Sequence, residues 1–408
     1  MRDGGGEGHA AALTTPRFRF FDIMQIYRPA MPSAPRPQLL LTELQKRVLL
    51  HLRIAGAQPR IDLAAALDTN SATITRVTQQ LVALDLIAEG APLEQGVRGR
   101  PSVPLTISGG GGWSVGATVQ PGWLELVLLD FRGTPLLHDT QPFDDPDPRV
   151  FARTLDARLR ALVAQHGFLR GRFLGLGVAV PGYALDGDLN RRAVVRRLSG
   201  WSDIPLAETL GDVLDMPIWI ENDATAAALG EYYQPGIIDR FRSILVLFLG
   251  HGIGGGLIAA RDLFRGDHGN AGEIGKLFPG EMLRPSGIDL IDTLRQAGVV
   301  IDSLSEVEAM LEPHAALIAT WIERVAVQLE QAVIGGAVWL DPGAVVVSGA
   351  LPHSILARLS ARITELSAPR HHGYQAPVPL VLPSTLGSRA VVIGAAMAPI
   401  HAVTAALP

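Results

Sequence analysis

A carboxylate and a neutral amide stand side by side at Asn222 and Asp223, where an apolar, strand-like segment changes to a helical one. Such a pair suits a sugar hydroxyl, because the carboxylate accepts its proton while the amide donates and accepts hydrogen bonds. Ligands of α/β sheets bind at the carboxyl ends of strands, which is where this pair is expected. The same two residues are also preferred helix N-caps. From the residues alone, both interpretations stay open.

A second set of polar side chains begins a helix nearer the N-terminus. Residues 71–84 (SATITRVTQQLVAL) follow a short helical segment and a turn, and Ser71 is the expected capping residue. The recognition helix of a helix-turn-helix presents short polar side chains at its N-terminal end, where they reach the major groove. The alternative is a small helical domain with a solvated polar face. The outward-facing candidates for DNA contact are Ser71, Thr73, Thr75, Arg76 and Gln79.

The segment after this helix, EGAPLEQGVRGRPSVPLTI, predicts a wing between two strands. Arg98 and Arg100 flank a glycine within it. These two side chains are placed to contact DNA phosphates or an adjacent minor groove.

The composition excludes several classes of protein. The chain has 408 residues, 48% hydrophobic and 18% charged, which excludes global disorder, and at roughly 100–200 residues per domain it predicts two to four domains. The absence of cysteine excludes disulfides, thiolate catalysis, iron–sulfur clusters and the usual structural zinc sites. A net charge of −5 argues against a globally basic coat for nucleic acid. Without a secretory signal or an apolar run long enough for a bilayer, we expect a cytoplasmic protein with no membrane partner.

Strand hairpins followed by alternating strands and helices occur twice after residues 109–112, a run of four glycines that we interpret as a hinge. This alternation predicts an α/β fold in two similar lobes. The final helix, residues 389–406, is expected to pack back on the first lobe. The expected organisation is a flexible tail over 1–37, a winged helix-turn-helix over 38–108, a first lobe over 113–230 and a second lobe over 231–388.

Residues 248–276, FLGHGIGGGLIAARDLFRGDHGNAGEIGK, closely resemble the signature of the ROK family of bacterial repressors and sugar kinases. The resemblance extends over almost all of residues 42–400, and it implies a winged helix-turn-helix followed by a two-lobed actin-like ATPase (ribonuclease H-like) domain. Each motif alone would be weak, but several occur in the family's order. They are the winged module ending in GRP, AVPG at 179–182, GW at 200–201, ENDATAAALGE at 221–231, AGEIG at 271–275 and VVVSGA at 345–350.

The resemblance also implies roles for individual residues. In the family's kinases, the aspartate matching Asp223 is the general base that deprotonates the attacked sugar hydroxyl. Glu273 matches a glutamate that binds sugar hydroxyls; the bland alternative is a surface acid after a glycine turn. We therefore expect a sugar site in the cleft between the lobes, and sugar binding is expected to close them. Its candidate ligand-binding residues are Asn222, Asp223, Glu273, Lys276 and Gly200.

Two departures from the family's kinases affect the expected ATP site. Ser114 stands in place of an aspartate that positions magnesium in the first phosphate hairpin, and its absence undermines phosphoryl transfer. His251 replaces a small hydroxyl residue in the second phosphate loop, where imidazole would crowd the phosphate; an ordinary loop histidine is the alternative. ATP is therefore not expected as a cofactor, and no residue is expected to be catalytic. The glycines of GHGIGG also fit a dinucleotide-binding template, but a hairpin rather than a helix is expected after them.

A further departure concerns zinc, which many family members bind through three cysteines and a histidine. This chain has no cysteine, and Lys276 stands where that histidine would be. An ammonium has no lone pair for a metal, so no zinc or other metal site is expected. Lys276 is instead expected to pair with Glu273 or to contact an anionic ligand such as a sugar phosphate or sugar acid. Asp289 is a possible counterpart of the family's second ligand glutamate.

Together these features predict a transcriptional regulator, a repressor whose affinity for operator DNA changes when a carbohydrate binds. An ATP-dependent sugar kinase with a fused DNA-binding module is the first alternative, and a regulator that answers to a partner protein is the second. One winged module per chain offers few contacts, so a homodimer or homotetramer on a pseudo-palindromic operator is expected.

Overall fold

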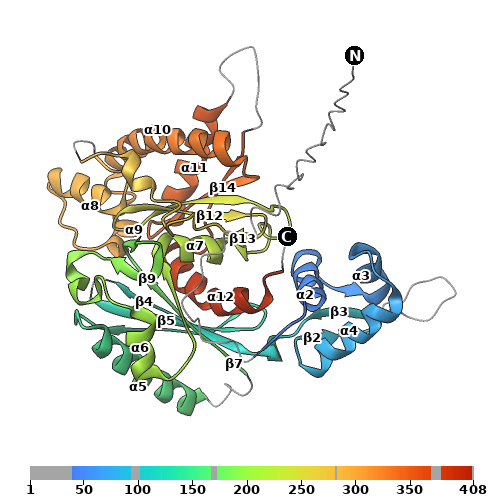
Figure 1. The fold of residues 1–408 in the computed structure, drawn as a ribbon. Coiled ribbons are helices and arrows are strands. Elements are labelled where there is room, and N and C mark those ends of the chain that lie inside the picture. The colour runs from blue at the N-terminus through green and yellow to red at the C-terminus, as the bar shows by residue number, and fades with distance from the viewer. Residues whose placement is uncertain are drawn as a thin grey trace, which may run out of the picture. The chain divides into compact units, whose positions relative to one another are not determined.

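Two five-stranded sheets with the same internal strand order dominate the structure, a computed structural model that describes residues 39–92, 102–120, 122–166, 172–280, 283–368 and 378–406 (Figure 1). In each sheet, three antiparallel strands are followed by two parallel strands reached through helices. The shared order agrees with the two similar lobes predicted from the sequence. The first sheet runs β10 (Ile218–Asn222), β7 (Phe173–Val180), β4 (Trp113–Gln120), β5 (Trp123–Asp130), β6 (Pro135–Pro142). The second runs β13 (Asp262–Leu263), β12 (Ile253–Ala259), β11 (Ile244–Leu249), β14 (Ala344–Gly349), β15 (Leu380–Pro383).

Helices cover both sheets, which explains why the central strands are almost continuously apolar. The outer face of the first sheet packs against α5 (Pro148–His166) and α6 (Leu206–Leu214). The second sheet packs against α8 (Gly287–Gln296), α9 (Val307–Met310), α10 (Ala315–Leu340) and α11 (His353–Ser367). None of the helices in the described part of the chain has both the length and the apolarity needed to cross a membrane.

Helices α7 (Asp223–Tyr232) and α12 (Ala390–Thr404) lie side by side between the two sheets (Figure 1). Small residues allow α12 to pack closely on its neighbours. On the first sheet, a Cβ added at Gly177 of β7 would come within 1.8 Å of the Ala395 carbonyl oxygen of α12. A Cβ at Gly394 would likewise come within 1.6 Å of the Ala226 carbonyl oxygen. The last helix therefore packs on the first sheet. A boundary at residues 230 and 231 would cut α7, which is continuous, so the change of lobe lies beyond Tyr232.

The N-terminal module contains α2 (Glu43–Ala55), α3 (Arg60–Ala66), α4 (Ser71–Ala83) and a small sheet of β1 (Gln58–Pro59), β3 (Pro104–Ile107) and β2 (Ile87–Glu89). Thr42 caps α2 in a capping box with Gln45. The cap of α4 is Asn70, whose side chain accepts from the Thr73 amide at 2.8 Å, so Ser71 is the first helical residue rather than the cap. The core is formed by Val48, Leu49, Leu63, Ile74, Leu81 and Leu86.

The glycine run at residues 109–112 is a packed 3-10 turn rather than the open hinge expected from the sequence. A Cβ at Gly110 would lie 2.2 Å from an Asp85 carboxylate oxygen, and one at Gly111 would lie 2.9 Å from side-chain atoms of Leu86 and Phe131. The glycines are therefore needed for close packing, because the N-terminal module contacts the first lobe at this point. Arg172 strengthens the contact by donating to the Gly111 carbonyl oxygen at 2.8 Å.

Candidate functional site

Asn222 and Asp223 lie where β10 ends and α7 begins. Asn222 is the N-cap of α7, and its Oδ1 accepts from the backbone N–H of Ala224 at 2.8 Å. Its Nδ2 donates to the Gly182 carbonyl oxygen at 2.8 Å. The amide is thus engaged in holding the strand-to-helix junction, and Asp223, the first residue of α7, carries the available carboxylate. Burial raises the pKa of Asp223, against the hydrogen bond from Ala224 and the positive charge of Arg192.

Arg192 is the centre of the charges around Asp223. It lies on β9 (Asp188–Ala193), which pairs with β8 (Tyr183–Leu185), and only 1% of its surface is exposed. Its guanidinium donates to the carbonyl oxygens of Leu189 and Gly182, and its Nε is buried with no partner among the described residues. Burial lowers the pKa of Arg192, and the negative charges of three neighbouring carboxylates oppose that shift. These carboxylates belong to Glu221, Asp223 and Glu273.

Glu273 reaches this cluster from the second lobe, directly before the 3-10 turn Ile274–Leu277. Burial raises the pKa of Glu273, the charge of Lys276 lowers it, and the charge of Asp223 raises it further. The structure therefore brings Asp223 of the first lobe and Glu273 of the second into electrostatic range. Two carboxylates held partly desolvated beside one cation can accept hydrogen bonds from several sugar hydroxyls.

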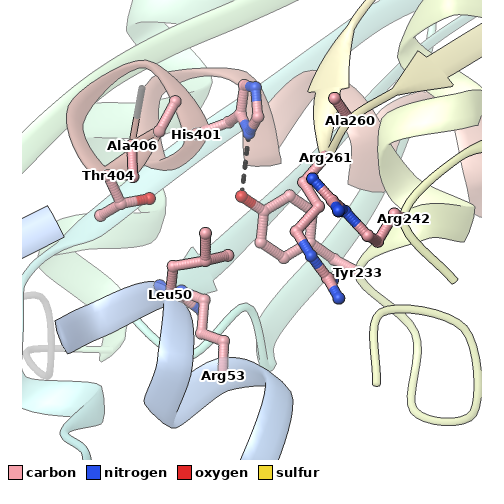
Figure 2. Close-up of a pocket in the computed structure, with 10 residues that line it drawn as sticks. Leu50, Arg53, Tyr233, Arg242, Ala260, Arg261, His401, Thr404 and Ala406 are labelled. Carbon is pink, nitrogen blue, oxygen red and sulfur yellow. Dashed lines mark hydrogen bonds between the residues drawn. The ribbon is translucent and has the colours of Figure 1, made fainter. Parts of the chain in front are cut away.

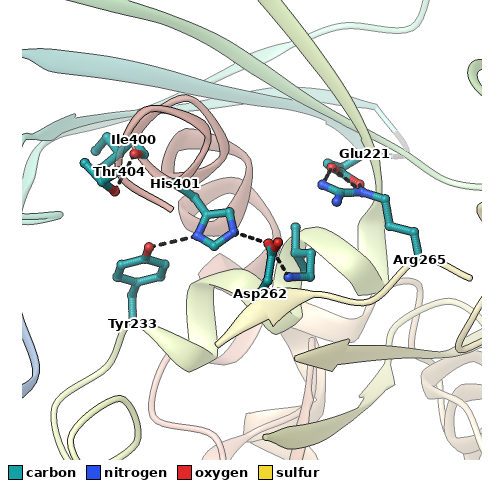
Figure 3. A network of polar contacts seen from close by, with 8 residues as sticks. Glu221, Tyr233, Asp262, Arg265, Ile400, His401 and Thr404 are labelled. Atoms are coloured by element: carbon teal, nitrogen blue, oxygen red, sulfur yellow. Dashed lines mark hydrogen bonds and ion pairs between the residues drawn. The ribbon is translucent and has the colours of Figure 1, made fainter. Parts of the chain in front are cut away.

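A buried ion pair supports the same junction. Glu221, the residue before Asn222, is bound by Arg265, which follows β13 (Figure 3). Burial lowers the pKa of Arg265, but the negative charge of Glu221 and the hydrogen bonds between the two side chains raise it by more. Glu221 therefore lies between two arginines, since its charge also acts on Arg192 together with those of Asp223 and Glu273.

Comparisons with known proteins identify the family to which the chain belongs. The sequence profile of the ROK family matches residues 126–287. The uncharacterized protein y4fQ of Sinorhizobium fredii is 31% identical over 366 residues, which span 89% of this chain and 91% of that protein. The chain belongs to the ROK family.

Other ROK proteins extend the comparison. The xylose repressor of Bacillus spizizenii is 27% identical over 57% of this chain and 59% of its own length, so the alignment leaves two fifths of that repressor unmatched. A solved ROK family transcriptional regulator, a homolog of the E. coli Mlc protein, has a TM-score of 0.66 and 21% identity over 89% of this chain and 96% of its own. A ROK glucokinase from Streptomyces griseus has a TM-score of 0.54 and 21% identity over 70% of this chain and 98% of its own. These structures share the fold.

The residues that depart from the ROK kinases have distinct settings. Ser114 is fully buried on β4, and its hydroxyl donates to the Ala396 carbonyl oxygen of α12 at 2.6 Å. It therefore acts in helix packing. His251 lies in the turn between β11 and β12, where desolvation and the charge of Arg197 lower its pKa, so the ring is held neutral.

The other family-derived candidates differ in their positions. Lys276 is exposed and its Nζ lies 6.0 Å from the Tyr183 ring centroid, a cation–π distance. Gly200 lies in the 3-10 turn Arg196–Trp201, where an added Cβ would come within 2.4 Å of the Pro146 carbonyl oxygen. Asp289 is not a sugar ligand as the sequence had suggested. It is buried inside the second lobe, where it accepts from Trp321 Nε1 at 2.7 Å and from Arg324.

The expected DNA contacts lie along the first two turns of α4. Ser71, Arg76 and Gln79 are exposed, and Thr73 and Thr75 are half-buried. The Thr75 hydroxyl donates back to the Ser71 carbonyl oxygen at 2.7 Å, so it is the least free of the five to bind a base. Arg98 and Arg100, the two wing candidates, lie outside the described residues.

Sequence reasoning missed Arg192 and Arg197, which belong to the polar run NRRAVVRR. A run with four arginines is usually solvated, but one of these four is fully buried. The charge of Asp223 also acts on Arg197, whose Nη2 donates to the Val119 carbonyl oxygen at 3.2 Å. The available signal was their position shortly before the GW motif, and it did not distinguish which arginine turns inward.

Proposed function

We propose that this ROK protein is a DNA-binding transcriptional regulator, a repressor whose operator affinity changes when its ROK domain binds a carbohydrate. The observation that carries the proposal is the face of α4. Ile74, Val77 and Leu81 turn into the module core, while Ser71, Arg76 and Gln79 face outward from the helix start. A recognition helix needs this division, since its first turns enter the major groove.

The operator is proposed to be pseudo-palindromic and bound by a homodimer or homotetramer. Within the described part of the chain, the outward face of α4 offers a single arginine, Arg76. Specific protein–DNA complexes of nanomolar affinity bury more surface than one small module supplies, so two modules on two half-sites are required. A protein that binds an operator acts where the chromosome lies, in the bacterial cytoplasm.

The effector is proposed to be a sugar or sugar derivative held by Asp223 and Glu273, with Asn222, Lys276 and Gly200 at the edges of its site. Because the two carboxylates come from different lobes, a bound sugar would link the lobes in a closed arrangement. The change in the free energy of operator binding cannot exceed the difference between the sugar's binding free energies for the closed and open states.

We also propose that the protein works without ATP and without zinc. Ser114 donates to a helix carbonyl in place of a magnesium-positioning carboxylate. The chain has no thiolate, and among the described residues no group of three or more His, Asp or Glu side chains could hold a metal ion, so the donors near Lys276 do not fit zinc. A sugar kinase remains the second candidate, favoured by the raised pKa of Asp223, which suits a general base. Sugar-stimulated ADP release well above that of an Asp223→Asn control would establish it.

The decisive experiment measures operator binding by fluorescence anisotropy, with DNA from upstream of the protein's own gene and a panel of sugars. Asp223→Ala should weaken sugar affinity by about tenfold to a hundredfold, because it removes charge-assisted hydrogen bonds of roughly 1.5–3 kcal/mol each. Its operator affinity without sugar should stay unchanged. Asp212→Ala, an exposed carboxylate on α6 of the same lobe, is the matched control and should behave as the parent protein.

Two outcomes of this experiment point elsewhere. If Asp223→Ala responds normally to the active sugar, the effector binds at another place. If calorimetry detects binding of DNA but of no sugar, the protein is regulated by a partner protein and its sugar site is vestigial.

A further inference from the structure

A pocket lined by none of the sugar-site residues lies between the N-terminal module and the ROK domain (Figure 2). It has a cavity volume of about 130 Å³. One wall comes from α2, another from the segments that flank β11 and β13, and a third from the end of α12 (Figure 2). The side chains that matter for its chemistry are Arg53, Arg242, Arg261, Tyr233, His401 and Thr404.

Three guanidinium groups line this pocket, and no carboxylate does among the described residues. Arg53 spans the interface by donating to the Phe131 and Arg132 carbonyl oxygens at 2.6 and 2.9 Å, and its Nε is buried without a partner. Arg261 uses its Nη1 to donate to the Ile238 carbonyl oxygen at 2.8 Å and to the Tyr232 hydroxyl at 3.0 Å, and no hydrogen bond from its Nη2 to a described residue is found. Arg242 is exposed, and within the described residues no side-chain hydrogen bond or ion pair engages its guanidinium. The pocket therefore has cationic donors to spare.

The nearest acids do not neutralise these cations. Asp262 is bound by His401 Nε2 at 2.8 Å, while His401 Nδ1 pairs with the Tyr233 hydroxyl at 2.9 Å (Figure 3). The charge of Asp130 acts on Arg53, whose pKa burial nevertheless lowers. Burial raises the pKa of Tyr233 to about 12, so its phenol stays a neutral hydrogen-bonding group. Among the described residues that line the pocket, the three guanidiniums therefore meet no carboxylate.

We propose that this pocket binds a small metabolite through a phosphate group, as an effector site separate from the sugar site. The N–H groups of a guanidinium are spaced to bind two oxygens of a phosphate. A phosphate group, with up to two negative charges, neutralises three cations better than a single carboxylate does. The Thr404 hydroxyl already donates to the Ile400 carbonyl oxygen and the Tyr233 hydroxyl pairs with His401, so the guanidinium groups are the donors for the phosphate. Leu50, Ala260 and Ala406 supply apolar contact for a small organic body.

The site's location gives the ligand a regulatory effect, a consequence that rests on the proposed function. Arg53 belongs to the helix-turn-helix module, whereas Arg242 and Arg261 belong to the second lobe. A phosphate bound by both sides adds a contact that holds the module against the ROK domain. Operator affinity then changes if DNA binding favours a different placement of the module.

The test begins with direct binding, measured on the whole protein by calorimetry and thermal unfolding without DNA. The probes are inorganic phosphate and glycerol 3-phosphate, with malonate as the dicarboxylate arm, all at constant ionic strength near 0.15 M. Phosphate probes should bind with Kd below about 1 mM, and malonate at least about tenfold more weakly. Absence of phosphate binding up to about 10 mM, or equal binding of malonate, overturns the proposal.

Matched variants locate the binding. Arg242→Ala should weaken phosphate binding by about tenfold or more, whereas Arg240→Ala, an exposed arginine two residues away that stacks over Phe241, should leave it within about twofold. Ala406→Trp, near the chain end, should fill the pocket and block binding. Equal effects of Arg242→Ala and Arg240→Ala overturn the placement. Operator titration with and without glycerol 3-phosphate comes last, so phosphate binding without any effect on DNA rejects only the regulatory consequence.

Discussion

The sugar site and the pocket beside α2 are both built around arginine, but they differ in what neutralises it. In the sugar site, Arg192 and Arg265 face the three carboxylates of Glu221, Asp223 and Glu273. In the pocket beside α2, three guanidiniums lie with the side chains of Tyr233, His401 and Thr404, and no carboxylate of the described residues lines it. The first balance leaves hydrogen-bond acceptors for a ligand rich in hydroxyls. The second leaves donors for an anion, so the ratio of carboxylates to guanidiniums decides the class of ligand.

The largest effect expected from this difference is on stability at the sugar site. Arg192→Met should lower the free energy of unfolding by about 1.5–3 kcal/mol, because it removes a buried guanidinium that donates to two carbonyl oxygens and offsets the charge of neighbouring carboxylates. Urea unfolding measures the change. Arg191→Met is the control. The guanidinium of Arg191, next to Arg192 in the sequence, is partly exposed and pairs with Asp203 at the surface, so its loss should cost less than about 1 kcal/mol. Equal losses in both variants would show that Arg192 does not hold the cluster together.

A second difference concerns pH. Burial raises the pKa values of Asp223 and Glu273, and each accepts the stronger, charge-assisted hydrogen bonds from hydroxyls only when it is ionised. Sugar affinity should therefore be complete above the raised pKa values and fall as pH drops through them, by up to about tenfold per pH unit for each carboxylate. Calorimetry between pH 8 and pH 5, a range of about 3 units, tests this. A Glu273→Gln variant should have weaker affinity with a shallower pH dependence, and a flat profile in the parent protein would contradict the prediction.

A smaller effect is expected on DNA. Arg76→Ala should weaken operator binding and reduce the slope of log affinity against log salt by about 1, if this side chain contacts a phosphate. Arg47, on α2, is the matched control because its guanidinium donates to the Leu67 carbonyl oxygen within the module. If Arg76→Ala and Arg47→Ala change the salt slope equally, α4 is not the DNA-facing helix.

The smallest effect is expected on stability at the pocket beside α2. Arg242→Ala should change the free energy of unfolding by less than about 0.5 kcal/mol without phosphate, because its guanidinium is exposed and crowded by other cations. The contrast with Arg192→Met separates an arginine that supports the fold from one that is available to a ligand. A loss above about 2 kcal/mol would make Arg242 a structural residue.

Local patterns in the sequence were sufficient for the helices and the two sheets. The alternation of strands and helices after residues 109–112 predicted both lobes, because each element is recorded in neighbouring residues. The hairpin of β8 and β9 was missed since its polar sequence, rich in Asp and Arg, carries no apolar alternation. The cap of α4 was misplaced by one residue because Asn70 and Ser71 are both good N-caps.

Properties that depend on distant contacts were harder to predict. Arg192 is buried by carboxylates that follow it by about 30 and about 80 residues, and no local pattern records that. The glycines at 109–112 were interpreted as a hinge because flexibility and close packing require the same small residue. Asp289 was aligned with a sugar ligand, but its partner Arg324 lies two helices further along.

The packing of α12 on β4 sets the order in which the protein can be completed on the ribosome. The hydrogen bond from the Ser114 hydroxyl cannot form until Ala396, whose carbonyl oxygen accepts it, has been synthesised 282 residues later. At about 5–20 residues per second, that interval lasts roughly 15–60 s. During it, the N-terminal module is already outside the ribosome, while the first sheet has an apolar face with nothing to cover it. A chain that stops before α12 therefore emerges with its DNA-facing helices made and its sheet unfinished, and such nascent chains are the ones most exposed to chaperones and proteases.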